Sequence, residues 1–330
     1  MNLKNKSLLI TGGTGSFGRA FVDKLIKKNI NLKKIIIFSR DELKQDQMRA
    51  IYPESKYKNI RYFLGDVRDY PRLLRALEGV DIIVHAAALK QVPSAEYNPM
   101  EFIKTNVIGA QNIIEASIEK NIKKVVALST DKACAPINLY GATKLCSDKL
   151  FIAANHYSGK GIFSVVRYGN VMGSRGSVVP RFLEQVKTGT LTLTDYRMTR
   201  FNLTLNQSVE IVLFAIKNSA GSEIIVPKIP SFKIIDLAKS IGPKCKIKVI
   251  GIRPGEKIHE EMISQSDSFT TFDIGNYYII LPTQNNKLIK KYKKFRIKKV
   301  KPNFRYDSGT NTKFLNIRDL KLLIRDYAVN

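Results

Sequence analysis

Cysteine is scarce in this chain of 330 residues, and long apolar runs are missing. The three cysteines, Cys134, Cys146 and Cys245, are odd in number and lack the spacing of metal ligands, which argues against a disulfide framework and a zinc site. Apolar runs fall short of the roughly 20 residues that a membrane helix requires. The run behind Met1–Lys6 breaks at Gly12, too early for a signal peptide. We therefore expect no bound metal, no membrane partner and a cytoplasmic location.

Acidic residues are also few, with 28 of them against 55 lysines and arginines, so the formal net charge is +27. Such an excess occurs in proteins that bind nucleic acid, anionic membranes or anionic small molecules. The lysines are scattered along the chain, and only Lys287–Lys301 forms a dense block, in which apolar side chains are interspersed. We interpret most of the charge as a solvated surface, expect part of this block to pack, and expect no nucleic-acid partner.

Hydrophobic residues make up 44% of the chain, which at this length indicates a globular protein with a large domain and a smaller one. The pattern predicts a loop at 173–180, a long helix at 99–120, and buried strands at 7–11, 34–38, 60–64, 81–85, 124–129 and 163–168. Strands that alternate with helices predict an α/β fold, a Rossmann-like doubly wound parallel sheet. We expect residues 1–170 to form this domain and 171–330 to form a smaller α/β substrate-binding domain, with some C-terminal elements returning to the first.

A glycine-rich turn follows the first expected strand and precedes an amphipathic helix. Glycines let the backbone approach a pyrophosphate, whose charge the free amides and the dipole of the helix N-terminus stabilise. Strand, turn and helix together predict a dinucleotide site that includes Gly12, Thr14, Gly15, Ser16, Phe17 and Gly18.

The end of the second expected strand should contact the adenosine ribose of that dinucleotide. Ser39 and Arg40 lie about twenty residues beyond the last glycine, and they suit the 2′-phosphate of NADP. If the strand ran two residues further, Asp41 would take the ribose position and NAD would be favoured. Both cofactors are therefore open, with NADP preferred.

Two further strand ends supply cofactor-binding candidates. Asp66 can accept a hydrogen bond from the adenine amino group with Val67 beside the ring, although a helix N-cap would also explain an aspartate here. His85 stands alone in an apolar context and is expected to be packed rather than catalytic. The small residues after it permit close approach of the cofactor: Ala86, Ala87 and Ala88.

The densest polar cluster lies where strand 124–129 ends and the next helix begins. Tyr140 and Lys144 are four residues apart, so phenol and ammonium share one helical face. A tyrosine with an ordinary pKa of about 10 needs a neighbouring cation to act as a base, and we expect Lys144 to supply that charge. A hydroxyl from Ser129 or Thr130 would complete the machinery for hydride transfer.

Asp131 and Lys132 are not needed for hydride transfer. An acid and a base at this place permit elimination after oxidation, because a ketone at C4 of a sugar acidifies the C5 hydrogen and an acid can protonate the departing C6 hydroxyl. Asp131 would need a raised pKa and Lys132 a lowered one, and burial shifts both pKa values in those directions. A structural salt bridge at the strand end is the alternative explanation.

Two later stretches, 194–201 and 251–257, carry clustered hydrogen-bonding side chains. Arginine can form bidentate hydrogen bonds with phosphate, and glutamate can accept hydrogen bonds from ribose hydroxyls. Surface arginines on loops would produce the same pattern. The candidates are Arg197, Arg200, Arg253 and Glu256.

The Tyr-x-x-x-Lys pair, combined with the glycine turn and Thr130, is specific for the short-chain dehydrogenase/reductase superfamily, which this chain resembles in its extended form. From Leu8 to about Leu323 the chain resembles more closely the inverting UDP-N-acetylglucosamine 4,6-dehydratases that begin pseudaminic acid synthesis. The Thr-Asp-Lys triplet is the most specific part, because related hexose 4,6-dehydratases usually carry glutamate where Lys132 stands. The segments that carry the resemblance are 11–18, 39–45, 85–90, 129–132, 140–144, 167–171, 198–201 and 253–257.

The resemblance implies a tightly held NADP, UDP-N-acetylglucosamine as substrate, and a homo-oligomer. Tyr140 would take the C4 hydroxyl proton as hydride leaves C4, Lys132 would take the C5 proton while Asp131 protonates the C6 hydroxyl, and hydride would return to C6. Reprotonation of C5 on the opposite face would give UDP-2-acetamido-2,6-dideoxy-β-L-arabino-hexos-4-ulose, for pseudaminic acid or a related surface glycan. The expected substrate-binding residues are Lys90, Asn170, Val178, Arg197, Arg200, Arg253 and Glu256.

Three other functions stay open. A capsule-type UDP-sugar 4,6-dehydratase/epimerase would differ in stereochemistry, and a plain 4-epimerase would have no use for Lys132. A non-catalytic nucleotide- or RNA-binding Rossmann protein would explain the positive charge, but it would have no use for Thr130, Asp131 or Tyr140.

Overall fold

The computed structural model describes residues 3–173, 177–283 and 286–329. Up to residue 168, strands alternate with helices in the order β1 Ser7–Thr11, α1 Ser16–Lys27, β2 Lys34–Ser39, α2 Glu42–Ile51, β3 Ile60–Leu64, α3 Tyr70–Ala76, β4 Ile82–His85, α4 Val92–Tyr97, α5 Pro99–Phe102, η1 Ile103–Ile108, α6 Gly109–Glu119, β5 Lys124–Thr130, η2 Asp131–Ala133, α7 Leu139–Ala154 and β6 Ile162–Tyr168.

Shorter elements follow in the second half of the chain. They are β7 Asn170–Val171, α8 Val178–Val186, β8 Thr190–Leu193, β9 Thr199–Leu203, α9 Leu205–Asn218, β10 Ile224–Pro227, β11 Ser231–Lys233, α10 Ile234–Ile241, β12 Lys246–Val249, β13 Glu261–Ile263, η3 Ser266–Thr270, β14 Thr271–Asp273, β15 Tyr277–Ile280, α11 Asn286–Lys291, η4 Lys293–Phe295, β16 Lys298–Lys299, β17 Tyr306–Asp307 and α12 Ile317–Val329.

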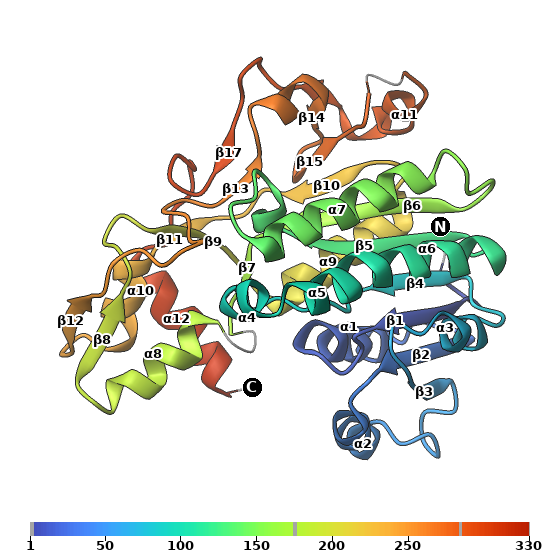
Figure 1. Cartoon of the computed structure of the whole chain (residues 1–330), viewed down its shortest axis with the longest axis horizontal. Helices are drawn as coiled ribbons and strands as arrows, with labels where there is room; N and C mark the ends of the chain where they lie inside the picture. Colours follow the sequence, from blue (N-terminus) through green and yellow to red (C-terminus); the bar gives the residue numbers. More distant parts are fainter. Residues whose placement is uncertain (1–2, 174–176, 284–285, 330) are drawn as a thin grey trace.

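A ten-stranded sheet in the order β16-β14-β15-β10-β6-β5-β4-β1-β2-β3 runs through the molecule (Figure 1). The strands from β10 to β3 are parallel to their neighbours, whereas β15, β14 and β16 pair antiparallel. Helices α7 and α9 both pack on β5 and β6, so they cover opposite faces, with α6 beside α7 and α1 beside α9. All five residues of β1 are buried, as in a parallel sheet covered on both faces. The predicted doubly wound α/β fold is confirmed.

The chain beyond residue 170 is divided between two hydrophobic cores. Helix α9 packs on the large sheet, and β10, β14, β15 and β16 belong to it. A second core lies between α8, β8, α10 and α12, at the left of Figure 1. Its fully or almost fully buried side chains are Val179, Phe182, Leu191, Leu193, Met198, Phe232, Leu237, Ala238 and Leu320.

Two local expectations differ from the structure, and one stretch without a predicted element contains part of a strand. The expected helix 99–120 is interrupted by the π-helical segment η1, in which the side chain of Asn106 bonds to both the backbone N–H and the carbonyl of Leu89. Helix α8 begins at Val178, inside the expected loop 173–180, of which residues 174–176 lie outside the described residues. The stretch 194–201 is not all loop, because Thr199–Leu203 forms β9 and all five of its residues are buried.

The basic block does pack in part, as predicted. Tyr292 is fully buried, and Leu288, Ile289, Phe295 and Ile297 contact the large core.

None of the described helices is long and apolar enough to cross a membrane, and no described group of three or more His, Cys, Asp or Glu residues could hold a metal ion. The three cysteines are free thiols.

Candidate active site

The expected catalytic residues lie where β5 ends and α7 begins, at the carboxyl edge of the parallel strands. Asn138 caps α7, since its side-chain oxygen accepts a hydrogen bond of 2.8 Å from the N–H of Gly141. A Cβ at Gly141 would lie 2.2 Å from the carbonyl oxygen of Lys132. Only glycine therefore lets the first turn of α7, with Tyr140, pack directly on the 131–133 turn.

Thr130, Asp131 and Lys132 form one hydrogen-bonded group. The hydroxyl of Thr130 donates to Oδ1 of Asp131 at 3.0 Å, and Nζ of Lys132 lies 3.1 Å from the same oxygen. Asp131 is 1% exposed, and its Oδ2 is buried without a hydrogen-bond partner among the described residues. Burial raises the pKa of Asp131, and the charge of Lys132 opposes that rise. The raised pKa expected of an acid at this position agrees with the structure.

The lowered pKa expected for Lys132 is wrong for the ligand-free site. Burial does work to lower the pKa of Lys132, but the charges of Asp131 and Glu260 outweigh it and raise the pKa. Nζ of Lys132 lies between the two carboxylates, 3.1 Å from an oxygen of each. Sequence reasoning counted the desolvation and missed the second carboxylate.

The charge of Lys132 also acts on Tyr140. Burial raises the pKa of the Tyr140 phenol to about 12, and the charge that most opposes this rise is that of Lys132, followed by a hydrogen bond with Thr130. Lys144 is buried, and desolvation lowers its pKa against the charge of Asp148. Lys132 thus contributes to the electrostatics of both the acid and the phenol.

A buried network supports this cluster from behind. The carboxylate of Asp148, one helical turn beyond Lys144, accepts a hydrogen bond of 2.7 Å from Ser129 and pairs with Arg167 at 3.3 Å. Desolvation raises the pKa of Asp148, opposed by the charges of Arg167 and Lys144. Ser129 is therefore engaged with Asp148, whereas Thr130 contacts the reactive group. Asp148 was missed, although its spacing from Tyr140 and Lys144 on one helical face was a usable signal.

The glycine turn has the shape that a dinucleotide requires. Gly12 has a φ of +64°, and a Cβ there would lie 3.0 Å from the backbone of Ala87. A Cβ at Gly18 would lie 2.4 Å from the carbonyl oxygen of Gly13, so α1 can begin at Ser16 only because this position is glycine. A tight glycine turn directly before a helix N-terminus fits the predicted dinucleotide cofactor.

The hydroxyl of Thr11 joins the ends of β1 and β4. It accepts hydrogen bonds of 3.1 Å from the N–H groups of Ala86 and Ala87, and it contacts Nδ1 of His85 at 2.9 Å. His85 is 1% exposed, and burial lowers its pKa to about 3. His85 is packed, as the sequence predicted, and it stays neutral in the folded protein.

The residues expected around the adenosine lie near one another. Strand β2 ends at Ser39, and Asp41 caps α2 and pairs with Lys44. Arg40 is half-exposed and lies 3.4 Å from Asp66. Burial opposes ionisation of Asp66, but hydrogen bonds from Arg68 and the charge of Arg40 lower its pKa.

The expected substrate-binding residues are dispersed. Arg200, in β9, is buried, and its Nε lies 3.7 Å from Glu260, which brings it to the catalytic cluster. Partial burial lowers the pKa of Lys90, and the nearby charge of Lys132 lowers it further. Arg197 is bound to Asp195 at the surface.

The four other substrate candidates belong to the second half of the chain. Arg253 pairs with Glu256 in the loop after β12, and Gly255 of that loop packs on Asn138 at the start of α7, where its carbonyl accepts a hydrogen bond of 2.8 Å. Asn170 lies in β7 with its side-chain oxygen buried and unpartnered among the described residues. Val178 begins α8 and packs against the smaller core.

Comparison with known proteins agrees with this arrangement. The model of a family described as "Polysaccharide biosynthesis protein" matches residues 8–282. The chain belongs to this family. A Campylobacter jejuni protein named UDP-N-acetylglucosamine 4,6-dehydratase (inverting) is 52% identical over 326 residues, which cover 96% of each chain. The resemblance drawn from the sequence is confirmed.

Other relatives carry different names or show the shared fold. A Rickettsia prowazekii protein named UDP-glucose 4-epimerase is 46% identical and covers 98% of this chain and 97% of its own. The X-ray structure of Pen from Bacillus thuringiensis is 36% identical, has a TM-score of 0.89, and matches the full length of both chains. DesIV from Streptomyces venezuelae, a dTDP-glucose 4,6-dehydratase solved with NAD and TYD bound, has a TM-score of 0.69 at 23% identity over 76% of this chain and 86% of its own.

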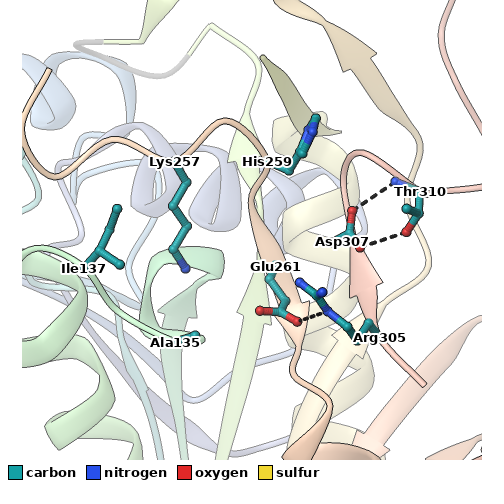
Figure 2. A pocket seen from close by; sticks show the side chains of 8 residues that line it. All are labelled: Ala135, Ile137, Lys257, His259, Glu261, Arg305, Asp307 and Thr310. Carbon is teal, nitrogen blue, oxygen red and sulfur yellow. Dashed lines mark hydrogen bonds and ion pairs between the residues drawn. The ribbon is translucent and has the colours of Figure 1, made fainter. Parts of the chain in front are cut away.

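Sequence reasoning about this family member missed Glu260, which is 3% exposed and touches the catalytic cluster. Its neighbours Lys257, His259 and Glu261 line a cavity with Arg305 and Asp307, as Figure 2 shows. The stretch before β13 forms no regular element, so no local pattern marked Glu260.

Proposed function

We propose that this protein is a UDP-N-acetylglucosamine 4,6-dehydratase that inverts C5. The observation that carries the proposal is the contact of Asp131 with Lys132 beside Tyr140, in a chain that is 52% identical to a relative of that name. A 4-epimerase, the name of the Rickettsia relatives, needs only to move hydride at C4. Removal of water needs in addition an acid and a base at the same place, and Asp131 and Lys132 are packed together there.

We propose NADP as the cofactor, held by the glycine turn before α1. Asp41 would favour NAD if it faced the ribose, but it caps α2 and pairs with Lys44. Arg40 is half-exposed at the end of β2, where a 2′-phosphate would lie. Ser39 is buried and accepts a hydrogen bond from Gln45, so Arg40 would make the main contact with that phosphate.

The glycine turn before α1 would hold the cofactor, which would supply the hydride acceptor for C4 of the sugar and the hydride donor for C6. Tyr140 must first release its phenol proton, and the phenolate then receives the proton of the C4 hydroxyl, with Thr130 as its hydrogen-bond partner and Lys132 as the main stabilising charge. Asp131 gives its proton to the C6 hydroxyl, which leaves as water, and burial raises the pKa of Asp131 in the direction that this role requires. Lys132 takes the C5 proton, and it must first lose one of its own.

The substrate diphosphate would bind between the large sheet and the smaller core. Arg200 and Arg253 supply the positive charge, and Asn170 and Glu256 each have a buried side-chain oxygen without a partner among the described residues. A uridine ribose presents hydroxyl donors that such oxygens can accept. Arg197 is expected to contribute less, because its guanidinium is exposed and already bound to Asp195.

The test is to incubate the purified protein with UDP-N-acetylglucosamine, without added cofactor, and to follow the sugar by NMR. We expect the C6 hydroxymethyl signals to be replaced by a methyl signal, with inverted configuration at C5. Persistent hydroxymethyl signals with a changed C4 centre would identify a 4-epimerase instead. A methyl signal with retained C5 configuration would refute the inversion and leave the dehydration.

A further inference from the structure

A second carboxylate contacts the lysine expected to act as the base. Oε1 of Glu260 lies 3.1 Å from Nζ of Lys132 and 3.7 Å from Nε of Arg200. Its other oxygen, Oε2, is buried and has no hydrogen-bond partner among the described residues. Burying a carboxylate costs free energy unless it is paired, so its position beside Lys132 calls for a role.

The backbone around Glu260 is fixed by neighbouring strands. Its N–H donates to the hydroxyl oxygen of Ser308 at 2.9 Å, and its carbonyl accepts from the N–H of Ser308 at 2.8 Å. The Ser308 hydroxyl in turn donates to the carbonyl of Thr199 in β9 at 3.1 Å. Glu261, the next residue, faces the cavity of Figure 2 and pairs with Arg305. The carboxylate of Glu260 is thus held in place on the catalytic side.

The chemistry of elimination creates a need that this carboxylate can meet. Lys132 cannot take the C5 proton as an ammonium ion, and the negative charge of Glu260 beside it works to raise its pKa. Asp131 must keep its own proton for the C6 hydroxyl, so it cannot also accept one from Lys132. Glu260 is then the carboxylate left within 3.1 Å of Nζ.

On the basis of the dehydratase function proposed above, we propose that Glu260 is a positioning residue for Lys132 that also receives its proton. An N–H bond of the Lys132 ammonium breaks and an O–H bond forms on Glu260, which leaves a neutral amine and a carboxylic acid. Lys132 then takes the C5 proton while Asp131 gives its proton to the leaving hydroxyl. Asp131 is now a carboxylate, and one proton that passes from Glu260 through Nζ of Lys132 restores the starting state.

The test compares Glu260→Gln with the matched variant Glu261→Gln, which removes a neighbouring carboxylate that faces away from Lys132. Two steps are followed separately: C4 oxidation, by the absorbance of reduced nicotinamide in a single turnover, and loss of the C5 hydrogen, by deuterium incorporation from D2O. We expect Glu260→Gln to oxidise C4 within about threefold of the wild-type rate and to lose the C5 hydrogen roughly a hundredfold more slowly. Glu261→Gln should behave like the wild type in both steps.

The pH profile separates proton transfer from a merely structural role. In Glu260→Gln, Lys132 must release its proton to solvent, so C5 exchange should rise by about tenfold for each pH unit between roughly pH 6 and 8. The wild type should change far less over this range, because the proton stays within the pair. Glu260→Asp keeps the carboxylate but places it one methylene further from Lys132. This variant should recover part of the C5 exchange rate and show the pH profile of the wild type.

Exchange at the wild-type rate in Glu260→Gln, or slowing by one constant factor at every pH, would overturn the proposal. If Glu260→Gln does not fold, as judged by thermal unfolding, Glu260→Asp decides: the wild-type pH profile supports the proposal, and a steep one overturns it. If the wild type and Glu261→Gln both fail to make a 4-keto-6-deoxy sugar, the dehydratase function itself is wrong. If only Glu260→Gln loses C5 exchange, the dehydratase function stands and the role of Glu260 is supported.

Discussion

The contact between Gly141 and the 131–133 turn predicts that Gly141→Ala will damage catalysis more than folding. The added methyl would lie 2.2 Å from the carbonyl oxygen of Lys132 and 3.0 Å from Cβ of Pro136. Contacts of a Cβ shorter than 3.0 Å essentially do not occur, so α7 and the turn must separate by about 1 Å. Tyr140 moves with the helix and Lys132 with the turn. A misplacement of this size costs on the order of a hundredfold in rate.

Stability should change less than activity in Gly141→Ala. Overpacking costs about 1–3 kcal/mol, and replacing glycine by alanine inside a helix returns about 1 kcal/mol. The assay is product formation from UDP-N-acetylglucosamine, with the free energy of unfolding measured in urea. The matched control is Ala142→Gly in the same helical turn, which should lose about 1 kcal/mol of stability and keep its rate. Wild-type turnover by Gly141→Ala would refute the argument that the direct contact sets the catalytic geometry.

Three further predictions concern single side chains. Lys132→Ala should abolish C5 proton loss in D2O while C4 oxidation remains visible as reduced nicotinamide; undiminished product would remove Lys132 from the base role. Arg40→Ala should lower the preference for NADP over NAD by roughly ten- to a hundredfold in measured dissociation constants, since a charged hydrogen bond to phosphate is lost, and an unchanged ratio would contradict its contact with the 2′-phosphate. His85 has a pKa of about 3 in the folded protein and 6.5 in the unfolded chain, so the unfolded chain takes up the proton first as the pH falls. The free energy of unfolding should therefore decrease below pH 6.5, by about 2 kcal/mol near pH 5. Urea unfolding near pH 7 and pH 5 should show this loss in the wild type and not in His85→Asn.

Local patterns predicted the large sheet well because both of its faces are covered. Strands of a buried parallel sheet are apolar throughout, and runs such as Leu8–Ile10 and Val125–Leu128 have no other simple explanation in a protein of this size. The glycine turn and the end of β5 then follow from chain order, because the carboxyl ends of parallel strands meet at one edge. The positions of Thr130, Asp131, Lys132 and Tyr140 were predictable for this reason.

The second half of the chain was harder to predict because its short strands are built from polar residues. Strand β9 reads Thr-Arg-Phe-Asn-Leu, and all five residues are buried, so neither alternation nor an apolar run marks it. Its partners β7 and β11 are separated from it in the sequence and come beside it only in the folded chain. No local pattern encodes that pairing. The interruption of helix 99–120 at η1 likewise depends on Asn106 bonding to Leu89, a tertiary contact.

The pKa of Lys132 shows how one missed tertiary contact changes a chemical conclusion. Desolvation alone would lower that pKa, but Glu260, 128 positions later in the chain, adds a second carboxylate and reverses the direction. The same contact gives a reason for lysine at position 132. With Glu260 ionised and Asp131 holding its proton, Lys132 and Arg200 offset the buried negative charge, whereas a glutamate at 132 would place three carboxyl groups around a single arginine. Mutual repulsion would then keep at least one of them protonated. Lys132 and Glu260 are therefore best understood as one unit, in which each residue makes the burial of the other tolerable.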